Sequence, residues 1–399
     1  MPRLCLALLS LPTLLFSHAS GRAQESPAGW PAFVRAFEAY AEAGKIVGAS
    51  ALVMRDGRVL ARHHVGHADL SAGRPVDERT IFHYGSITKT LNAIAVLQLR
   101  DRGLLDLDDP VTRWVPELRA VHDPYGSPDD ITLRMLLTHT AGFQGSTWPW
   151  DEGESWEPFE PTEWSQLVAM MPYQRLQFAP GSRYSYSNPG FLYLARVVER
   201  IAGEPWVAYV QKNLFAPLGM ARSYFGTTPY HLAAYRSHNY ELRADSLTDE
   251  LEAVDEGADF DPGITIPNGG WNAPLDDVAA YLAFLTGPAP DPDTASRREL
   301  VLTRETLEEM WEPQMTVEED GTGAVWTDVG LSFFLVREPG GRRIVGHTGS
   351  QANFRSFLEL DPERRTAWGM VFNTSVEDGP DPGAAELDLL LAAGRRLLD

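Results

Sequence analysis

The sequence predicts an α+β fold in which one antiparallel sheet is flanked by helices and joined to a helical lobe. Three observations support this fold class. Strand-like patterns occur near both ends of the 399-residue chain, at residues 48–64 and 329–373. Residues from about 120 to 310 favour short helices and long loops, and no repeat of fixed period occurs. Both chain ends are therefore expected to build one sheet around an inserted helical lobe, with any active site in the cleft between the lobes.

The first elements are predicted to be a helix and a hairpin. Trp30 to Ala43 carries apolar side chains at helical spacing, which is typical of an amphipathic helix. Its apolar face holds Phe33, Val34, Phe37 and Tyr40. Gly48 to Met54 and Arg58 to His64 have strand character, and the Asp56-Gly57 pair between them is a tight-turn signal. These two segments predict a β-hairpin.

The middle of the chain is predicted to be helical. Residues 86–102 favour a helix, and Gly103 supplies its stop. Residues 104–116 have the turn-rich composition of a connector. The clearest helices after that are Ile131 to Leu137 and Gly190 to Ala202.

The C-terminal part predicts consecutive antiparallel strands and a last helix. The strands are Val329 to Val336, Arg343 to His347, Phe354 to Leu360 and Thr366 to Asn373. Ala384 to Leu398 has the pattern of a terminal helix.

Residues 1–23 are predicted to be an export signal. Arg3 provides a short positive region, and the apolar run from Leu4 to Phe16 is too short to span a membrane. Small residues follow, with cleavage expected after Ala19 or Ala23. An uncleaved membrane anchor is the alternative.

The single cysteine, Cys5, lies inside this leader. The mature chain therefore needs no disulfide, even in an oxidising compartment. No cysteine lies next to a cleavage site, which argues against a lipid anchor. We expect residues 24–399 to form one domain, periplasmic or secreted, without stable membrane insertion once the signal is cleaved.

The chain is strongly acidic. Its formal charge is −21, and loss of Arg3 and Arg22 with the leader would make it −23. Such a surface disfavours binding to nucleic acids or anionic membranes. The acidic run from Glu241 to Asp261 is predicted to be a solvated loop.

Lys89 is an unusual residue for this chain. Only three of its 34 basic residues are lysines, the others being Lys45 and Lys212. A buried lysine can lose its proton and act as a base, whereas arginine stays protonated. Ser86 lies three residues earlier, on the same face of a helix. A serine hydroxyl becomes a useful nucleophile when a neighbouring base takes its proton.

Three separated segments carry the chemistry: Ser86-Ile87-Thr88-Lys89, Tyr186-Ser187-Asn188 and His347-Thr348-Gly349-Ser350. With them the chain closely resembles the class C β-lactamase-like serine hydrolases, a family of β-lactamases, D-alanyl-D-alanine carboxypeptidases, D-aminopeptidases and carboxylesterases. The resemblance runs from about Gly48 to Asn373. It includes 105–110, 136–142 (Leu-Leu-Thr-His-Thr-Ala-Gly), 180–182 and 267–270 (Pro-Asn-Gly-Gly). It implies a β-lactamase/penicillin-binding-protein-like fold.

The resemblance also implies roles for the residues of these segments. Ser86 would be the acylated nucleophile, Lys89 its partner amine, Tyr186 the second proton-transfer group, and Asn188 a residue that orients the substrate. Which group takes the first proton stays open.

Oxyanion donors would be the backbone N–H groups of Ser86 and Ser350. His347, Thr348 and Gly349 would contact the substrate, and the missing side chain at Gly349 would let it lie against the strand.

His347 departs from the lactamases of this family, which carry lysine there. A histidine charges near pH 6.5, so it would hold a substrate carboxylate less firmly at pH 7. As an imidazolium it could still stabilise a Tyr186 phenolate, and activity would then weaken as the pH rises past its pKa. For His139 we expect a structural hydrogen-bonding role rather than chemistry.

Other features are weaker. Strand alternation points His63 and His64 to opposite faces, so these two and His67 do not suggest a zinc site, and we expect neither metal nor cofactor. Tryptophans 148, 150, 156 and 164 either pack on the surface or form a wall of the substrate cleft.

The sequence thus predicts an exported serine hydrolase that forms an acyl-enzyme with a small-molecule or short-peptide substrate, an ester or an amide. The alternative within enzymes is a β-lactamase or D-alanyl-D-alanine carboxypeptidase. The alternative of another class is a catalytically silent module that binds peptidoglycan or β-lactams.

Overall fold

The computed structural model describes residues 27–143, 161–245, 248, 250–317, 326–338, 341–376 and 379–399. The predicted export signal lies outside these residues. Within them, no helix combines the length and the apolar character needed to cross a bilayer.

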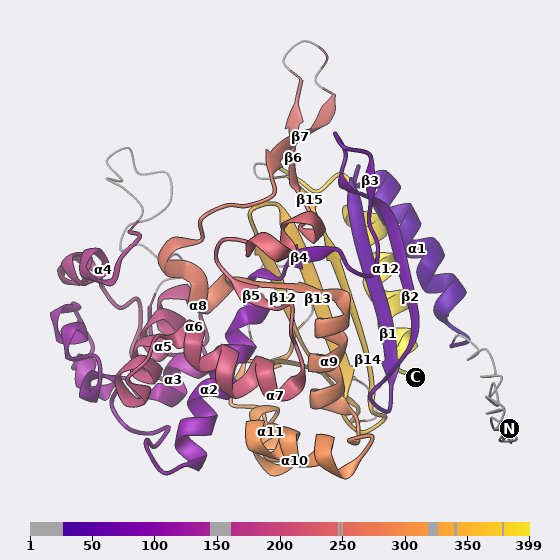
Figure 1. The fold of residues 1–399 in the computed structure, drawn as a ribbon. Helices are drawn as coiled ribbons and strands as arrows, with labels where there is room; N and C mark the ends of the chain where they lie inside the picture. Colours follow the sequence, from indigo (N-terminus) through magenta and orange to yellow (C-terminus); the bar gives the residue numbers. More distant parts are fainter. Residues whose placement is uncertain are drawn as a thin grey trace, which may run out of the picture.

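A nine-stranded sheet organises the molecule (Figure 1), in the order β3-β2-β1-β14-β13-β12-β11-β10-β9. Its strands are β1 (Gly48–Arg55), β2 (Arg58–Asp69), β3 (Arg74–Pro75), β9 (Met315–Thr316), β10 (Asp328–Val329), β11 (Phe334–Arg337), β12 (Arg343–Gln351), β13 (Phe354–Asp361) and β14 (Thr366–Phe372). All neighbouring strands are antiparallel. Both ends of the chain therefore contribute to one sheet, as predicted.

Two small sheets complete the strands. One has the order β4-β8-β5 and the other β15-β6-β7. Their bounds are β4 (Ile81–His83), β5 (Tyr224–Phe225), β6 (Asn239–Ala244), β7 (Leu251–Gly257), β8 (Trp271–Pro274) and β15 (Thr374–Ser375).

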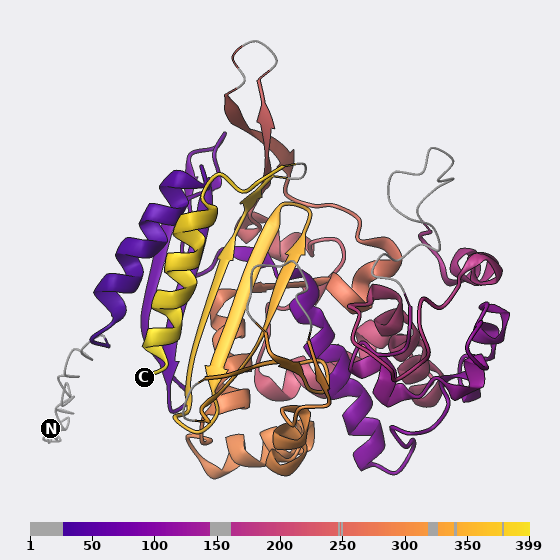
Figure 2. The same cartoon turned by 180° about the vertical axis from the view of Figure 1, so that it is seen from behind.

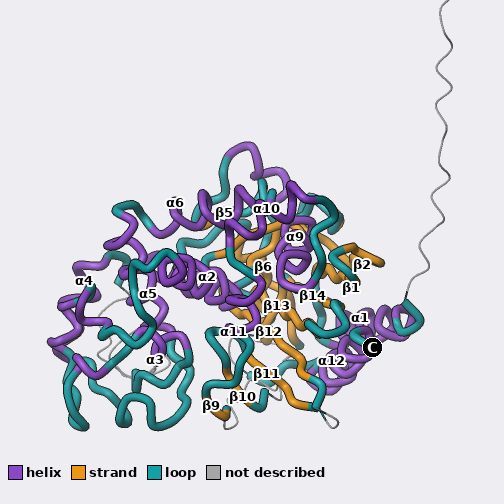
Figure 3. Tube along the Cα trace, turned by 90° about the horizontal axis from the view of Figure 1, so that it is seen from below, coloured by secondary structure: helices purple, strands orange, loops and turns teal. Residues whose placement is uncertain are grey.

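The helices form two layers around the sheet and a lobe beside it (Figures 1 and 2). They are α1 (Trp30–Ala43), α2 (Thr88–Asp101), α3 (Leu133–Leu137), α4 (Trp164–Met170), α5 (Asn188–Ala202), α6 (Trp206–Val210), α7 (Ala216–Leu218), α8 (Ile266–Gly269), α9 (Leu275–Thr286), α10 (Pro292–Val301), α11 (Arg304–Met310) and α12 (Ala384–Leu397). Helices α1 and α12 pack together on one face of the sheet, and α9 packs on the other. Figure 3 shows α2, α3, α4 and α5 gathered in the helical lobe.

The core divides along the same layers. Between the sheet and α1 with α12 lies an aromatic cluster that includes Phe33, Phe37, Trp368 and Phe372. The larger cluster on the other face runs from the sheet through α9 and α2 into the lobe. The helix α2 is buried along nearly its whole length because it lies between the sheet and the lobe.

Several predicted elements have the expected bounds, and others differ for physical reasons. The helix at Trp30–Ala43 and the hairpin around Asp56-Gly57 are confirmed. Strand 343–347 is longer than predicted and continues to Gln351. Helix α3 begins at Leu133 rather than Ile131 because Thr132 caps it, accepting a hydrogen bond from the Met135 N–H at 3.2 Å.

The predicted strand Val329 to Val336 is wrong as one element. A turn divides it into β10 and β11, closed by a 2.8 Å hydrogen bond from the Gly330 N–H to the Phe333 carbonyl. Inside the turn, Ser332 has a positive φ of 70° and donates its N–H to the carbonyl of Leu137 in the lobe at 2.8 Å. The interruption ties the sheet to the lobe, a tertiary contact that strand propensity does not reveal.

The acidic run from Glu241 to Asp261 is also not a loop. It contains most of β6 and all of β7, which pair as an antiparallel hairpin that projects from the body (Figure 1). Tyr240 and Leu242 are buried on one face of β6, while most of its acids face outward. The loop was predicted from the acidic composition alone, which does not take account of this alternation of buried and exposed residues along a strand.

Candidate active site

Ser86 lies in a tight turn between β4 and α2. It belongs to a 3₁₀ turn, η1 (Gly85–Ile87), so α2 begins at Thr88 and not at Ser86. Gly85 has a φ of 51°. The Thr88 hydroxyl donates to the Gly85 carbonyl at 2.6 Å and accepts from the Trp271 N–H at 2.9 Å. These bonds hold the turn that presents Ser86 to the pocket.

Lys89 meets Ser86 from the first turn of α2. Its Nζ lies 2.9 Å from Ser86 Oγ and donates a hydrogen bond to the Asn268 carbonyl at 2.8 Å. The side chain is fully buried, and its amine lies 4.9 Å from the Tyr186 ring centroid. Burial lowers the pKa of Lys89 well below its ordinary value of 10.5, and no carboxylate among the described residues opposes this shift. A neutral amine here keeps a lone pair that can accept the Ser86 proton.

His139 supports the segment that carries Tyr186. Its ring stacks on the Tyr186 ring with centroids 4.5 Å apart, and its Nδ1 accepts the Ser187 N–H at 3.0 Å. Its carbonyl accepts the Ser185 N–H at 2.8 Å. His139 is buried with a left-handed φ of 56°, and burial lowers its pKa well below 6.5. The predicted structural hydrogen-bonding role is confirmed.

The strand β12 passes directly beside the serine turn. A methyl group on Gly85 would lie 2.8 Å from the Ser350 backbone nitrogen, and one on Gly349 would lie 2.0 Å from the Tyr84 carbonyl oxygen. Both glycines are therefore needed for the close approach of two backbones. The structure thus explains the glycine at 349 by the nearby Tyr84 carbonyl, whereas the reason predicted from the sequence was space for the substrate.

A pocket of about 430 Å³ opens at this junction. It is lined by Ser86, Tyr186, Asn188, Phe334, Thr348, Gly349, Ser350, Arg355 and Phe357. The structure therefore brings most of the predicted site residues to one cavity, with Lys89 buried behind Ser86. Asn188 begins α5, after Ser187 caps that helix through its hydroxyl.

His347 is the predicted site residue that the structure places elsewhere. It is 2% exposed, is absent from the pocket lining and packs against the Phe334 ring at 5.1 Å. Burial is the larger cause that lowers the pKa of His347 to about 3, and the charge that Lys89 carries when it is protonated is the smaller one. The ring is therefore neutral at pH 7, and the expectation that an imidazolium could stabilise a phenolate there is wrong.

Sequence reasoning missed four residues of this site. Asn268 receives the Lys89 hydrogen bond through its carbonyl, and its segment was visible only as a family motif. Phe334, Arg355 and Phe357 line the pocket. Two of them could have been found from the pairing of the predicted strands. Arg355 lies opposite Ser350, and Phe357 lies opposite Thr348, across β12 and β13.

Arg355 is the one cation among the described residues that line the pocket. It is already paired, because it donates to the Asp381 carboxylate and to the Tyr40 hydroxyl. A substrate anion would have to compete with Asp381 for this guanidinium.

His63 and His64 make separate contacts. His63 Nε2 lies 3.1 Å from Glu38 on α1, and His64 Nδ1 lies 2.9 Å from the Ser50 hydroxyl.

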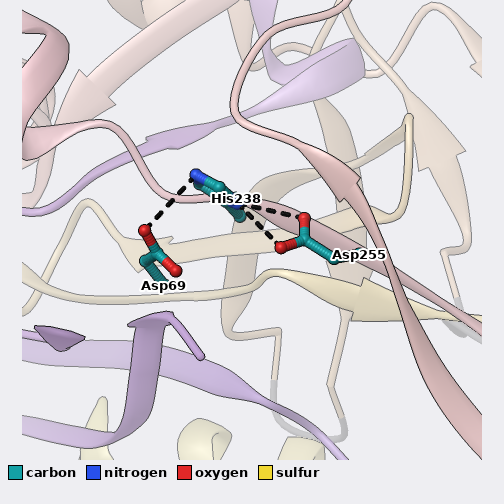
Figure 4. A group of neighbouring side chains, drawn as sticks. All are labelled: Asp69, His238 and Asp255. Atoms are coloured by element: carbon teal, nitrogen blue, oxygen red, sulfur yellow. Dashed lines mark hydrogen bonds and ion pairs between the residues drawn. The ribbon is translucent and has the colours of Figure 1, made fainter. Parts of the chain in front are cut away.

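A different group has metal-ligand composition: Asp69, His238 and Asp255 (Figure 4). Its imidazole lies between the two carboxylates, with Nδ1 3.0 Å from Asp255 and Nε2 3.6 Å from Asp69. Both ring nitrogens thus already face carboxylates, and the contacts tie β7 to the end of β2.

Of the four tryptophans predicted either to pack on the surface or to form a wall of the substrate cleft, only Trp164 lies in the described part of the chain. Tryptophans 148, 150 and 156 lie outside the described residues. Trp164 packs against Tyr193 and Arg196 of α5, and it does not line the pocket that contains Ser86.

The sheet, the lobe and the contact between Ser86 at the pocket and the buried Lys89 define a class of protein, the serine hydrolases that pair serine with lysine. Residues 33–393 match the family model described as Beta-lactamase. The chain belongs to the β-lactamase family, as the sequence motifs predicted.

The proteins to which this chain is similar carry different names: an esterase, a penicillin-binding protein homologue and a D-amino acid amidase. Esterase EstB of Burkholderia gladioli is 35% identical over 283 residues, which span 64% of this chain and 70% of the esterase. The structure of the octameric penicillin-binding protein homologue from Pyrococcus abyssi superposes with a TM-score of 0.72 at 25% identity, covering 91% of this chain and 77% of that one. The D-amino acid amidase from Ochrobactrum anthropi superposes with a TM-score of 0.70 at 21% identity, covering 92% of this chain and 99% of that one, and shows the fold alone.

Proposed function

We propose that this protein is an exported serine hydrolase, periplasmic or secreted, that cleaves carboxylic esters through an acyl-enzyme at Ser86. The observation that carries the proposal is the 2.9 Å contact between Ser86 Oγ and the Lys89 amine, whose burial favours its neutral form, at the wall of a 430 Å³ pocket. The esterase relative at 35% identity supports the choice of ester.

The proposed reaction uses Ser86, Lys89, Tyr186 and two backbone N–H groups in turn. Ser86 Oγ attacks the ester carbonyl carbon while its proton passes to the Lys89 nitrogen. The N–H groups of Ser86 and Ser350 donate hydrogen bonds to the carbonyl oxygen as it becomes negative. The C–O bond to the alcohol breaks, and the alcohol leaves with a proton relayed through Tyr186. Water then attacks the acyl carbon and gives one proton to the Lys89 amine. The bond between Ser86 Oγ and the acyl carbon breaks, the carboxylic acid leaves, and the proton on Lys89 restores the Ser86 hydroxyl.

Two features argue against efficient β-lactam hydrolysis. The lysine of the lactamases is replaced by His347, which is buried and neutral at pH 7. The cation that lines the pocket, Arg355, is paired with Asp381. A carboxylate on the substrate therefore finds no free positive charge among the described lining residues.

Amides of D-amino acids are the second candidate. A D-amino acid amidase shares the fold over nearly the whole chain, and Asn188 lines the pocket as a residue that could hold an amide. A silent binding module is disfavoured, because such a protein has no need of a deprotonated buried amine beside the serine.

The first experiment is covalent labelling with a fluorophosphonate. Wild-type protein is expected to be labelled at a ratio of one to one, with no labelling of Ser86→Ala, whose ester hydrolysis should fall by more than about 10⁴-fold. Folded wild-type protein that takes no label would refute the proposal, and a stable acyl adduct without product release would favour the binding module.

The substrate is tested with a panel of short-chain nitrophenyl esters, D-amino acid amides and a chromogenic cephalosporin. We expect the highest kcat/KM with the esters. A higher value with the amides would replace esterase by amidase, and one with the cephalosporin would restore the β-lactamase. Cell fractionation tests export, since retention in the cytoplasm would contradict it.

A further inference from the structure

We propose that Gln351 and His83 are positioning residues that hold the strand β12 at a fixed place relative to the Lys89 amine. The proposal rests on the proposed function and assigns roles to two side chains outside the pocket. Neither residue lines the cavity that contains Ser86. They act through the groups to which they bind.

Gln351 directly follows Ser350, at the end of β12. Its Oε1 lies 3.1 Å from His83 Nε2, and its Nε2 donates to the Thr265 hydroxyl at 3.0 Å. Thr265 immediately precedes α8, the short helix that contains Asn268. One amide side chain thus joins the strand with the expected oxyanion donor to the helix that accepts the Lys89 hydrogen bond.

The amide of Gln351 packs tightly against α8. A methyl group on Gly269 would lie 2.5 Å from Gln351 Oε1, so glycine at this position lets the amide press against α8. Gly269 follows Asn268, whose carbonyl is 2.8 Å from Lys89 Nζ. Movement of Gln351 would therefore shift the acceptor that orients the amine.

His83 connects the same amide to the serine turn. It lies at the end of β4, three residues before Ser86, and it is 1% exposed. Its Nδ1 lies 2.9 Å from Asn272 Oδ1 on β8, and its ring packs against Phe260 and Phe354 at 4.9 and 5.9 Å. A single imidazole therefore touches β8 and β12 from the strand that leads to the nucleophile.

This network links three parts of acyl transfer: the nucleophile turn, the oxyanion strand and the acceptor of the amine. Acyl transfer is sensitive to their relative positions, since a displacement of about 1 Å can cost about 100-fold in rate. Hydrogen bonds that lock such groups contribute to kcat without touching substrate. Loss of the network should therefore lower kcat and leave substrate binding largely intact.

The test compares Gln351→Met with Gln98→Met. Gln98 is a buried amide on α2, and its Nε2 donates to the carbonyls of Asn213 and Val301. Both variants lose a side-chain amide that makes two contacts, so both should lower the melting temperature. Gln351→Met should also lower kcat and the fluorophosphonate labelling rate by about 10- to 100-fold, with KM within about 3-fold of wild type. Gln98→Met should keep the wild-type kcat.

Thr265→Val is the second variant, in case Gln351→Met does not fold. It removes only the hydroxyl that accepts from Gln351 and should lower kcat in the same direction. Combined with Gln351→Met, it should add little further loss of kcat, because both changes break the same hydrogen bond between Gln351 and Thr265.

A folded Gln351→Met or Thr265→Val protein with kcat within about 2-fold of wild type would overturn the inference, as would an equal loss in Gln98→Met. Failure of the proposed function is distinguished from this, because it would show as an unlabelled wild-type protein.

Discussion

At the scale of single residues, the chemistry of the site depends on the protonation of Lys89. Its amine contacts the Ser86 hydroxyl and the Asn268 carbonyl, and neither of these partners carries a negative charge. An ammonium group would be buried here without a counter-ion, which is costly. The fold therefore favours the form of the residue that a base requires.

This protonation predicts a particular pH–rate profile. The value of kcat/KM should rise with pH as Lys89 deprotonates, with a midpoint well below 10.5. Lys89→Arg keeps the positive charge and should lower kcat/KM by about 10²- to 10⁴-fold across the range. Lys212→Arg, at an exposed ion pair with Glu204, serves as the control and should match wild type. A midpoint near 10.5, or an active Lys89→Arg protein, would contradict the assignment.

For His347, the sequence predicts the position in the site segment but not the burial of the side chain. Its place in the site segment could be predicted from the motif, as could the nearness of Ser86 to Lys89. Its burial could not, because that depends on Phe334, which belongs to a different strand. A side chain whose strand borders a pocket can still point away from it, and the pKa follows the direction of the side chain.

At the scale of elements, the site is assembled where the turn η1 meets the strand β12. Gly85 and Gly349 bring the two backbones together, and Ser356 donates its hydroxyl to the Tyr84 carbonyl at 2.9 Å from the next strand. The distance from Ser86 to the expected oxyanion donor at Ser350 is thus set by how closely β12 packs against the turn η1.

Gly349→Ala should separate these elements. The added methyl group would lie 2.0 Å from the Tyr84 carbonyl, a fixed backbone atom, so β12 must move away from Ser86. We expect kcat/KM to fall by about 100-fold or more, together with the melting temperature. Gly369→Ala on β14 is the matched control. Its methyl would meet the end of the Leu358 side chain, which can shift, and activity should be kept. Full activity in Gly349→Ala would show that the close approach is dispensable.

Elements with a regular pattern were predictable, and those shaped by distant contacts were not. The amphipathic helix at Trp30–Ala43 has its predicted bounds because its own apolar face determines its packing. The break between β10 and β11 is set by Leu137 of the lobe, which accepts the Ser332 N–H. The hairpin of β6 and β7 escaped prediction because its acidic composition is typical of loops.

At the scale of the whole molecule, burial of three histidines makes stability depend on pH. Burial lowers the pKa of His83 to about 4 and of His347 to about 3, and it lowers that of His139 as well. The unfolded chain binds protons near pH 6.5, whereas the folded chain does not. Stability from these groups is therefore complete above pH 6.5 and is lost as the pH falls toward their folded pKa values.

Acid should accordingly weaken the fold already between pH 6.5 and pH 5. Between pH 6.5 and pH 5, His347 alone should cost about 2 kcal/mol in the free energy of unfolding. Urea titrations at pH 7.5 and pH 5 measure this difference. His347→Gln should show a smaller loss, and His231→Gln, at an exposed site, should show the loss of wild type. Equal losses in both variants would exclude His347 as the cause.

The pairing of β1 with β14 has a consequence for how the protein is made. The Gly48 N–H bonds to the side chain of Asn373, 325 residues later. A chain emerging from the ribosome therefore carries its first hairpin with one edge of β1 unpaired until β14 has been translated. Pairing between segments so far apart in the sequence slows folding and leaves the unpaired edge exposed to chaperones in the meantime. The sheet, and with it the serine site, therefore cannot be completed before β14 is available.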